Sequence, residues 1–185
     1  MEIKKALSFL LLIIFYSCFS TSAEINKVKF TDNVTEKNKI LKINGLAVRT
    51  YMFTDVYAAA LYLPDLESNA AKVLDAKTIK LLKIHYFTSI SKEDLKKVWA
   101  VALLENCQDA CAQFRTAFSE FDSATTDVKN GTEITYYFDP HFVEVRNSAN
   151  TIKILKDGFD KVLLSTWIGP KPPTEKVKNG LLGKK

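Results

Sequence analysis

Apolar and polar residues alternate along the first half of the chain in the way that is typical of β-strands. Residues 40–43 lead into Asn44-Gly45, a dipeptide that favours a tight hairpin turn. Apolar runs of strand length follow at 46–53, 56–63 and 78–87. We therefore expect a series of β-strands here, with one short helix at 69–76.

A helical period begins after residue 90. Ser91 and Asp94 form a capping-box-like start. Apolar residues then recur at helical spacing on one predicted face: Leu95, Val98, Trp99, Ala102 and Leu103. A second helix carries Phe114, Phe118 and Phe121 at the same period. We interpret this aromatic stripe as core packing.

The second half returns to strands and closes with helices. Strands are predicted at 132–138, 142–146 and 151–155, and a helix from Phe159 to Trp167 that stops at Gly169-Pro170. Thr174 is the expected N-cap of a last short helix, and Gly180 its expected left-handed residue at the C-terminal end. This order predicts an α+β domain, with an antiparallel sheet and helices gathered on one face.

The first 23 residues have the pattern of a secretory signal peptide. Lys4 and Lys5 precede an apolar run at 6–19, and Thr21-Ser22-Ala23 offers small residues for cleavage after Ala23. As a helix the run would rise roughly 21 Å, less than the hydrocarbon core of about 30 Å. We expect a mature domain of residues 24–185 in the periplasm or outside the cell. An uncleaved anchor and lipoprotein processing at Cys18 are the alternatives.

Composition places the chain among ordinary globular domains. Its 185 residues are 47% hydrophobic and 25% charged. The net charge of +5 is too small and too dispersed for a nucleic-acid partner. No second long apolar run appears, so we expect no membrane span after cleavage.

Two cysteines remain after cleavage, Cys107 and Cys111. In an oxidising compartment their spacing favours a disulfide, which a helix break at Asn106 would permit. Two buried thiols on a helix face are the alternative. His85 and His141 show no ligand spacing to these cysteines, and no phosphate-binding loop or hydrolase motif is present, so we expect no metal and no cofactor.

Arg49 is the most distinctive polar residue, because it follows Asn44-Gly45 inside an otherwise apolar strand pattern. A guanidinium there either reaches solvent at a strand edge or binds an anion. Its rigid fork of donors pairs bidentately with a carboxylate.

Several segments resemble bacterial chalcone isomerase-like proteins. Residues 44–64, NGLAVRTYMFTDVYAAALYLP, are similar to the turn-and-strand signature of that family, and residues 158–183 to its closing helices. Residues 91–106 and 127–131 fit its middle. The resemblance implies an open-faced β-sandwich, in which a large antiparallel sheet is covered by a layer of helices and a ligand cleft lies between them.

The resemblance also suggests site residues. Arg49 is similar to the arginine that lines the cleft of chalcone isomerases, and Thr166 to a late threonine of that site. Tyr57 stands in place of a strand threonine, as in the fatty-acid-binding relatives, where arginine and tyrosine hold the lipid carboxylate. The family's tyrosine-lysine-asparagine group has no match within residues 84–94. The resemblance therefore implies a non-catalytic domain that binds a fatty acid or similar apolar carboxylate through Arg49, Tyr57 and Thr166.

Two other functions stay open at this point. One is an intramolecular lyase of chalcone isomerase type, with Arg49 stabilising developing negative charge. The other is a structural or partner-binding envelope protein whose cleft is closed, with Tyr57 as a space-filling residue. Period-2 counting places Tyr57, Ala59, Leu61 and Leu63 on one strand face, where the small Ala59 would leave room for a ligand.

Overall fold

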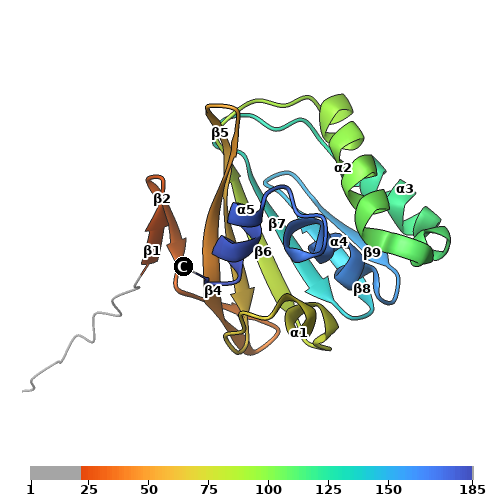
Figure 1. The fold of residues 1–185 in the computed structure, drawn as a ribbon, viewed down its shortest axis with the longest axis horizontal. Helices are drawn as coiled ribbons and strands as arrows, with labels where there is room; N and C mark the ends of the chain where they lie inside the picture. The colour runs from red at the N-terminus through yellow and green to blue at the C-terminus, as the bar shows by residue number, and fades with distance from the viewer. Residues whose placement is uncertain (1–21, 185) are drawn as a thin grey trace, which may run out of the picture.

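An antiparallel sheet forms the centre of the molecule, and each of its strands lies beside the next along the chain (Figure 1). The structure, a computed structural model, describes residues 22–184. Within them the seven strands of this sheet are β3 (Asn33–Glu36), β4 (Lys39–Tyr51), β5 (Thr54–Leu63), β6 (Lys80–Tyr86), β7 (Glu133–Asp139), β8 (Phe142–Arg146) and β9 (Thr151–Leu155). The predicted strands from residue 40 onward are therefore present.

A separate hairpin, β1 (Ser22–Ile25) with β2 (Val28–Thr31), precedes the sheet. The sequence pattern did not predict this hairpin or β3. The predicted signal peptide lies outside the described residues, apart from Ser22 and Ala23, which are the first half of β1. Cleavage after Ala23 would leave Glu24 and Ile25 paired with Lys29 and Val28.

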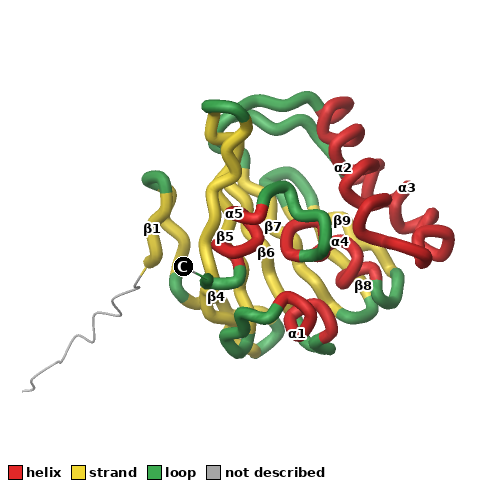
Figure 2. The backbone as a smooth tube through the Cα atoms, viewed as in Figure 1, coloured by secondary structure: helices red, strands yellow, loops and turns green. Residues whose placement is uncertain are grey.

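The helices all lie on one face of the sheet (Figure 2). They are α1 (Ala70–Asp75), α2 (Lys92–Cys107), α3 (Arg115–Ala124), α4 (Phe159–Ile168) and α5 (Glu175–Leu181), with a 3₁₀ helix (Gln108–Phe114) between α2 and α3. This arrangement confirms the predicted α+β class, with a large antiparallel sheet covered by helices. None of the helices in residues 22–184 is long and apolar enough to cross a membrane.

The two faces of β5 belong to two separate cores, and one of them is the face predicted from the alternation. Tyr57, Ala59, Leu61 and Leu63 pack under the helices. Ala58, Ala60 and Tyr62 face the other way, into a smaller core that includes Phe30 of the β1–β2 hairpin. The small side chains of Ala58, Ala59 and Ala60 allow other elements to pack closely against both faces of this buried strand.

The sheet curls, so that its first strand comes close to β8. Arg146 on β8 donates to Glu36 of β3 at 2.9 Å and also pairs with its neighbour Glu144 at 2.7 Å. Lys37, in the turn after β3, places its ammonium 4.4 Å from the ring centre of Phe142. These contacts enclose the smaller core between the curled sheet and the turn before β4.

Asn44-Gly45 is not a hairpin turn, contrary to the prediction. The dipeptide lies inside β4, at a register shift in its pairing with β5. The Asn44 amide donates to the carbonyl oxygens of Leu181 (2.9 Å) and Glu67 (3.0 Å), and its oxygen accepts from the Glu67 N–H at 2.8 Å. The chain reverses instead at Met52-Phe53, where Tyr51 pairs with Thr54.

Two glycines let β4 and α5 touch backbone to backbone. A Cβ on Gly45 would lie 2.1 Å from the Gly180 carbonyl oxygen, and a Cβ on Gly180 would lie 2.5 Å from that of Leu46. The prediction that Gly180 is the left-handed residue at the helix end is wrong. That role falls to Gly183, whose φ is +64°. Gly180 is required for the close approach, not for a positive φ.

Most helix starts and faces follow the sequence pattern. The Ser91 hydroxyl accepts from the Asp94 N–H at 3.2 Å and donates to its carboxylate at 2.9 Å. Thr174 caps α5 by accepting from Val177 N–H at 3.1 Å. The phenylalanine stripe is core, as expected, with Phe114 and Phe121 buried and Phe118 packed against them. Val98 is the exception on α2, because its side chain is exposed.

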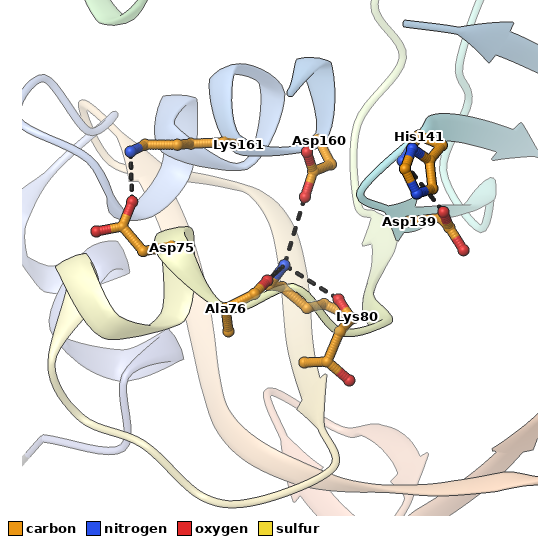
Figure 3. Close-up of polar contacts among 8 residues, drawn as sticks. Asp75, Ala76, Lys80, Asp139, His141, Asp160 and Lys161 are labelled. Atoms are coloured by element: carbon orange, nitrogen blue, oxygen red, sulfur yellow. Dashed lines mark hydrogen bonds and ion pairs between the residues drawn. The ribbon is translucent and has the colours of Figure 1, made fainter. Parts of the chain in front are cut away.

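A buried ion pair joins the sheet to α4 (Figure 3). The Lys80 ammonium, on β6, lies 3.5 Å from a carboxylate oxygen of Asp160 in the first turn of α4. It also donates to the carbonyl oxygens of Ala76 at 2.9 Å and Thr78 at 3.2 Å. Burial lowers the pKa of Lys80, and the Asp160 carboxylate opposes that shift. The neighbouring pair Lys161–Asp75 links α4 to α1 at the exposed surface.

Substituting Gly45→Ala is expected to lower the free energy of unfolding by about 3 kcal/mol, because a Cβ there overlaps backbone rather than a movable side chain. Urea unfolding measures the change. Gly131→Ala is the matched control, since a Cβ at Gly131 meets nothing within 4 Å and costs only the strain of its positive φ, about 1 kcal/mol. Equal losses in the two variants would contradict the close-approach explanation.

Substituting Asp160→Asn is expected to destabilise the fold by about 3–5 kcal/mol, because it leaves the Lys80 ammonium buried without its counter-charge. Asp75→Asn breaks the exposed pair on the same helix and should have little effect. Thermal unfolding measures these changes. The combined Lys80→Met and Asp160→Leu variant should recover most of the stability that Asp160→Asn loses. A double variant as unstable as Asp160→Asn would show that the pair is not the cause.

Candidate ligand-binding cleft

A cleft of about 680 Å³ opens between the helix-covered face of the sheet and α2. Its sheet wall is formed by β4, β5 and β6, and its opposite wall by α2 and the end of α4. Lys171, Pro172 and Pro173, in the link between α4 and α5, complete the lining. Most of the surrounding side chains are apolar or aromatic.

Three residues form a row across the sheet wall. Arg49 on β4 is the cross-strand partner of Tyr57 on β5, and Tyr57 is the partner of Tyr86 on β6. Residues paired in this way project from the same face of a sheet with their Cβ atoms about 4.5–5.5 Å apart. All three line the cleft, and the Tyr57 and Tyr86 rings meet edge to face with their centres 5.9 Å apart.

Arg49 is half-buried, and its guanidinium makes no hydrogen bond or ion pair with any residue in 22–184. The other charged residues of the lining are Lys97, Lys171 and Glu105. Lys97 is already paired with Asp94 at 2.9 Å. Arg49 is therefore a cation without a counter-charge in the described part of the chain, placed beside two buried tyrosines.

The tyrosine hydroxyls of this wall stay protonated at neutral pH. Burial raises the pKa of Tyr57 to about 12, although the nearby Arg49 charge and a hydrogen bond with the Trp167 side chain oppose the shift. Burial also raises the pKa of Tyr86 and of Tyr136 behind it. Tyr57 can thus donate a hydrogen bond to an anion but cannot act as a base at neutral pH.

Thr166 on α4 also lines the cleft, so the structure brings all three predicted binding residues to one site. Its hydroxyl donates to the Leu163 carbonyl oxygen at 2.7 Å, one turn earlier in the helix. The Thr166 hydroxyl therefore has no proton left to donate to a ligand, although its oxygen can still accept a hydrogen bond. Ala59 does not line the cleft, contrary to the expectation, because it is fully buried between its strand partners Ala47 and Ile84.

Several lining residues were missed by the sequence analysis. Tyr86, Trp99 and Trp167 form much of the inner wall, and the two indoles meet edge to face at 5.1 Å. Val98 and Val101 on α2 form the outer wall and are exposed. A signal for them exists in the sequence, because residues 95–104 are apolar nearly all round the helix, more than one buried face requires.

The end of α2 is tied to the α4–α5 link. The Asn106 amide donates to the carbonyl oxygens of Ala102 and Lys171, each at 2.9 Å, and accepts from the Lys171 N–H at 3.2 Å. Cys107 and Cys111 are joined by a disulfide just beyond, where α2 gives way to the 3₁₀ helix. These contacts hold the two segments that form the cleft's helical wall against each other.

Neither histidine lines the cleft, and each contacts an exposed acidic side chain. His85 contacts Glu133 at 3.2 Å, and His141 contacts Asp157 at 3.0 Å. Within residues 22–184 no cluster of three His, Cys, Asp or Glu side chains could hold a metal ion.

Comparisons with known proteins agree with this fold. The crystal structure of a fatty-acid binding protein from Arabidopsis thaliana matches with a TM-score of 0.71, over 88% of this chain and 96% of the plant protein. The sequence identity is 12%, so this likeness concerns the fold alone. No curated protein matches the sequence. A family model described as chalcone isomerase-like matches residues 22–183, and the chain therefore belongs to the chalcone isomerase-like family.

Proposed function

We propose that this protein is a non-catalytic binding domain for a fatty acid or a similar apolar carboxylate. The carboxylate would accept hydrogen bonds from Arg49 and Tyr57, and the hydrocarbon chain would lie along the apolar lining of the cleft. The observation that carries the proposal is the Arg49 guanidinium, which has no counter-charge among the described residues and lies beside a protonated tyrosine inside an apolar cleft.

The energetics favour this class of ligand. Charge-assisted hydrogen bonds contribute about 1.5–3 kcal/mol each, and burial of the chain adds about 0.8 kcal/mol per methylene. The cleft volume of about 680 Å³ is within the usual range for small-molecule sites, about 300–1,000 Å³. The fold it shares with a plant fatty-acid binding protein supports the same class.

The two other interpretations receive less support. A closed-cleft protein would have no cavity at Arg49, whereas the cleft is open there. The lyase interpretation has less support because the tyrosine-lysine-asparagine group of chalcone isomerases has no match within residues 84–94. A cyclisation assay with a chalcone, compared with its background rate in solution, tests the lyase alternative directly.

We also propose that the domain works outside the cytoplasm, after removal of residues 1–23. The basic and apolar pattern of that segment supports export. The Cys107–Cys111 disulfide fits an oxidising compartment.

Arg49→Ala is expected to weaken binding of dodecanoate at least about tenfold, since it removes the counter-charge of the carboxylate. Isothermal titration calorimetry measures the affinity. Arg115→Ala is the matched control, because Arg115 is exposed on α3 and does not line the cleft. Tyr57→Phe, which removes only the hydroxyl, should have a smaller effect of the same sign.

An Arg49→Ala variant with unchanged affinity and unchanged stability would sink the proposed site. Dodecanol provides a second check, because it keeps the chain and lacks the charge. Its binding should be weaker than that of dodecanoate and insensitive to Arg49→Ala.

A further inference from the structure

The hairpin between β4 and β5 ends in an exposed apolar tip. Tyr51, Met52 and Phe53 follow one another there, and Phe53 is fully exposed. Met52 has a φ of +53°, a conformation that usually selects glycine or asparagine in a two-residue turn. The turn conformation is therefore unfavourable for a residue such as methionine, which points to a role for the exposed side chains of the tip.

A second exposed apolar stripe runs along α2. Val98, Val101 and Leu104 are each more than half exposed. Their spacing of three residues keeps them on one side of the helix. The side that carries Leu95 and Leu103 is buried in the core, so α2 is apolar on two sides.

The tip and the stripe border the same cleft. Tyr51 lines it from the hairpin, and Val98 and Val101 line it from α2. Figure 1 shows the end of the β4–β5 hairpin and the start of α2 at the same end of the molecule. An apolar compound that enters or leaves the cleft would pass between these two exposed surfaces.

We propose that this mouth docks on an anionic lipid bilayer, with Met52 and Phe53 inserted among the lipids and α2 lying against the surface. This inference rests on the proposed function, because an apolar carboxylate partitions into lipid bilayers and would be taken from or delivered to one. Three of the four charged residues that line the cleft are basic: Arg49, Lys97 and Lys171, against Glu105. The whole chain carries +5, and residues 24–185 keep +4 once Lys4, Lys5 and Glu2 are removed. Both excesses favour an anionic surface.

The shape of the tip favours a bilayer over a second copy of the chain. A stable dimer needs a broad complementary patch, about 800 Å² on each partner. The tip is a narrow two-residue turn that projects from a hairpin, a shape suited to insertion between lipids.

The test measures flotation of the exported, processed chain with phosphatidylcholine vesicles, with and without phosphatidylglycerol. Met52→Gly combined with Phe53→Asn places glycine at the one turn position with positive φ and removes both apolar side chains, so the fold should be kept. We expect at least about a tenfold loss of binding to the anionic vesicles, with dodecanoate affinity in solution and thermal stability unchanged. Leu155→Ser is the control, because Leu155 is an exposed apolar residue on β9 that does not line the cleft.

The proposal is overturned if the unaltered chain does not float with anionic vesicles, or if the Gly-Asn variant floats equally well. It is also overturned if the unaltered chain is a dimer, the Gly-Asn variant is a monomer, and neither binds vesicles. The Arg49→Ala variant separates this inference from the proposed function, because it should weaken dodecanoate binding and leave the Met52-Phe53 tip intact. Tip-dependent vesicle binding by a chain that does not bind dodecanoate would uphold the docking and refute the ligand.

Discussion

The backbone contact between β4 and α5 is the constraint on which the rest of the molecule depends. It exists because Gly45 and Gly180 carry no side chains, and Asn44 fastens it with hydrogen bonds to Leu181 and Glu67. The contact lies at the register shift between Ile43 and Gly45, where β4 divides into two halves that serve different parts of the molecule. Its first half joins β3 over the smaller core, and its second half carries Arg49 into the cleft.

The cleft combines a polar pair with a mostly apolar and aromatic lining. Arg49 and Tyr57 lie opposite each other on neighbouring strands, so their spacing is set by the sheet and not by a loop. Trp99 and Trp167 pack behind them, and Asn106 holds the end of α2 to Lys171. A site built in this way is rigid at the charged end and open at the apolar end, where the exposed residues of α2 and the hairpin lie.

The sequence was informative wherever a local pattern determined the structure. Capping at Ser91 and Thr174 and the period of the later strands were predicted correctly. The Asn44-Gly45 pattern was misleading because Asn44 bonds to Leu181 and Gly45 packs against Gly180. Both partners are far along the chain, so a rule based on neighbouring residues cannot predict them. The early strands β1–β3 were missed because each has four residues and their turns use Asn26-Lys27 and Lys37-Asn38 at positive φ. Arg49 stood out as a cation in an apolar strand pattern, Tyr57 and Thr166 came from the family resemblance, and Tyr86 and Trp167 needed the fold.

The contact between Asn44 and Leu181 spans 137 residues, which has a consequence for how the chain acquires its structure. The partners of Asn44 and Gly45 are absent until the last helix has emerged, so we expect the Arg49 end of the cleft to be completed late in folding. Loop closure over such a separation is slow compared with the formation of neighbouring hairpins. If the chain is exported from its N-terminus as proposed, its cleft would therefore stay incomplete, and accessible to chaperones, until translocation is nearly finished.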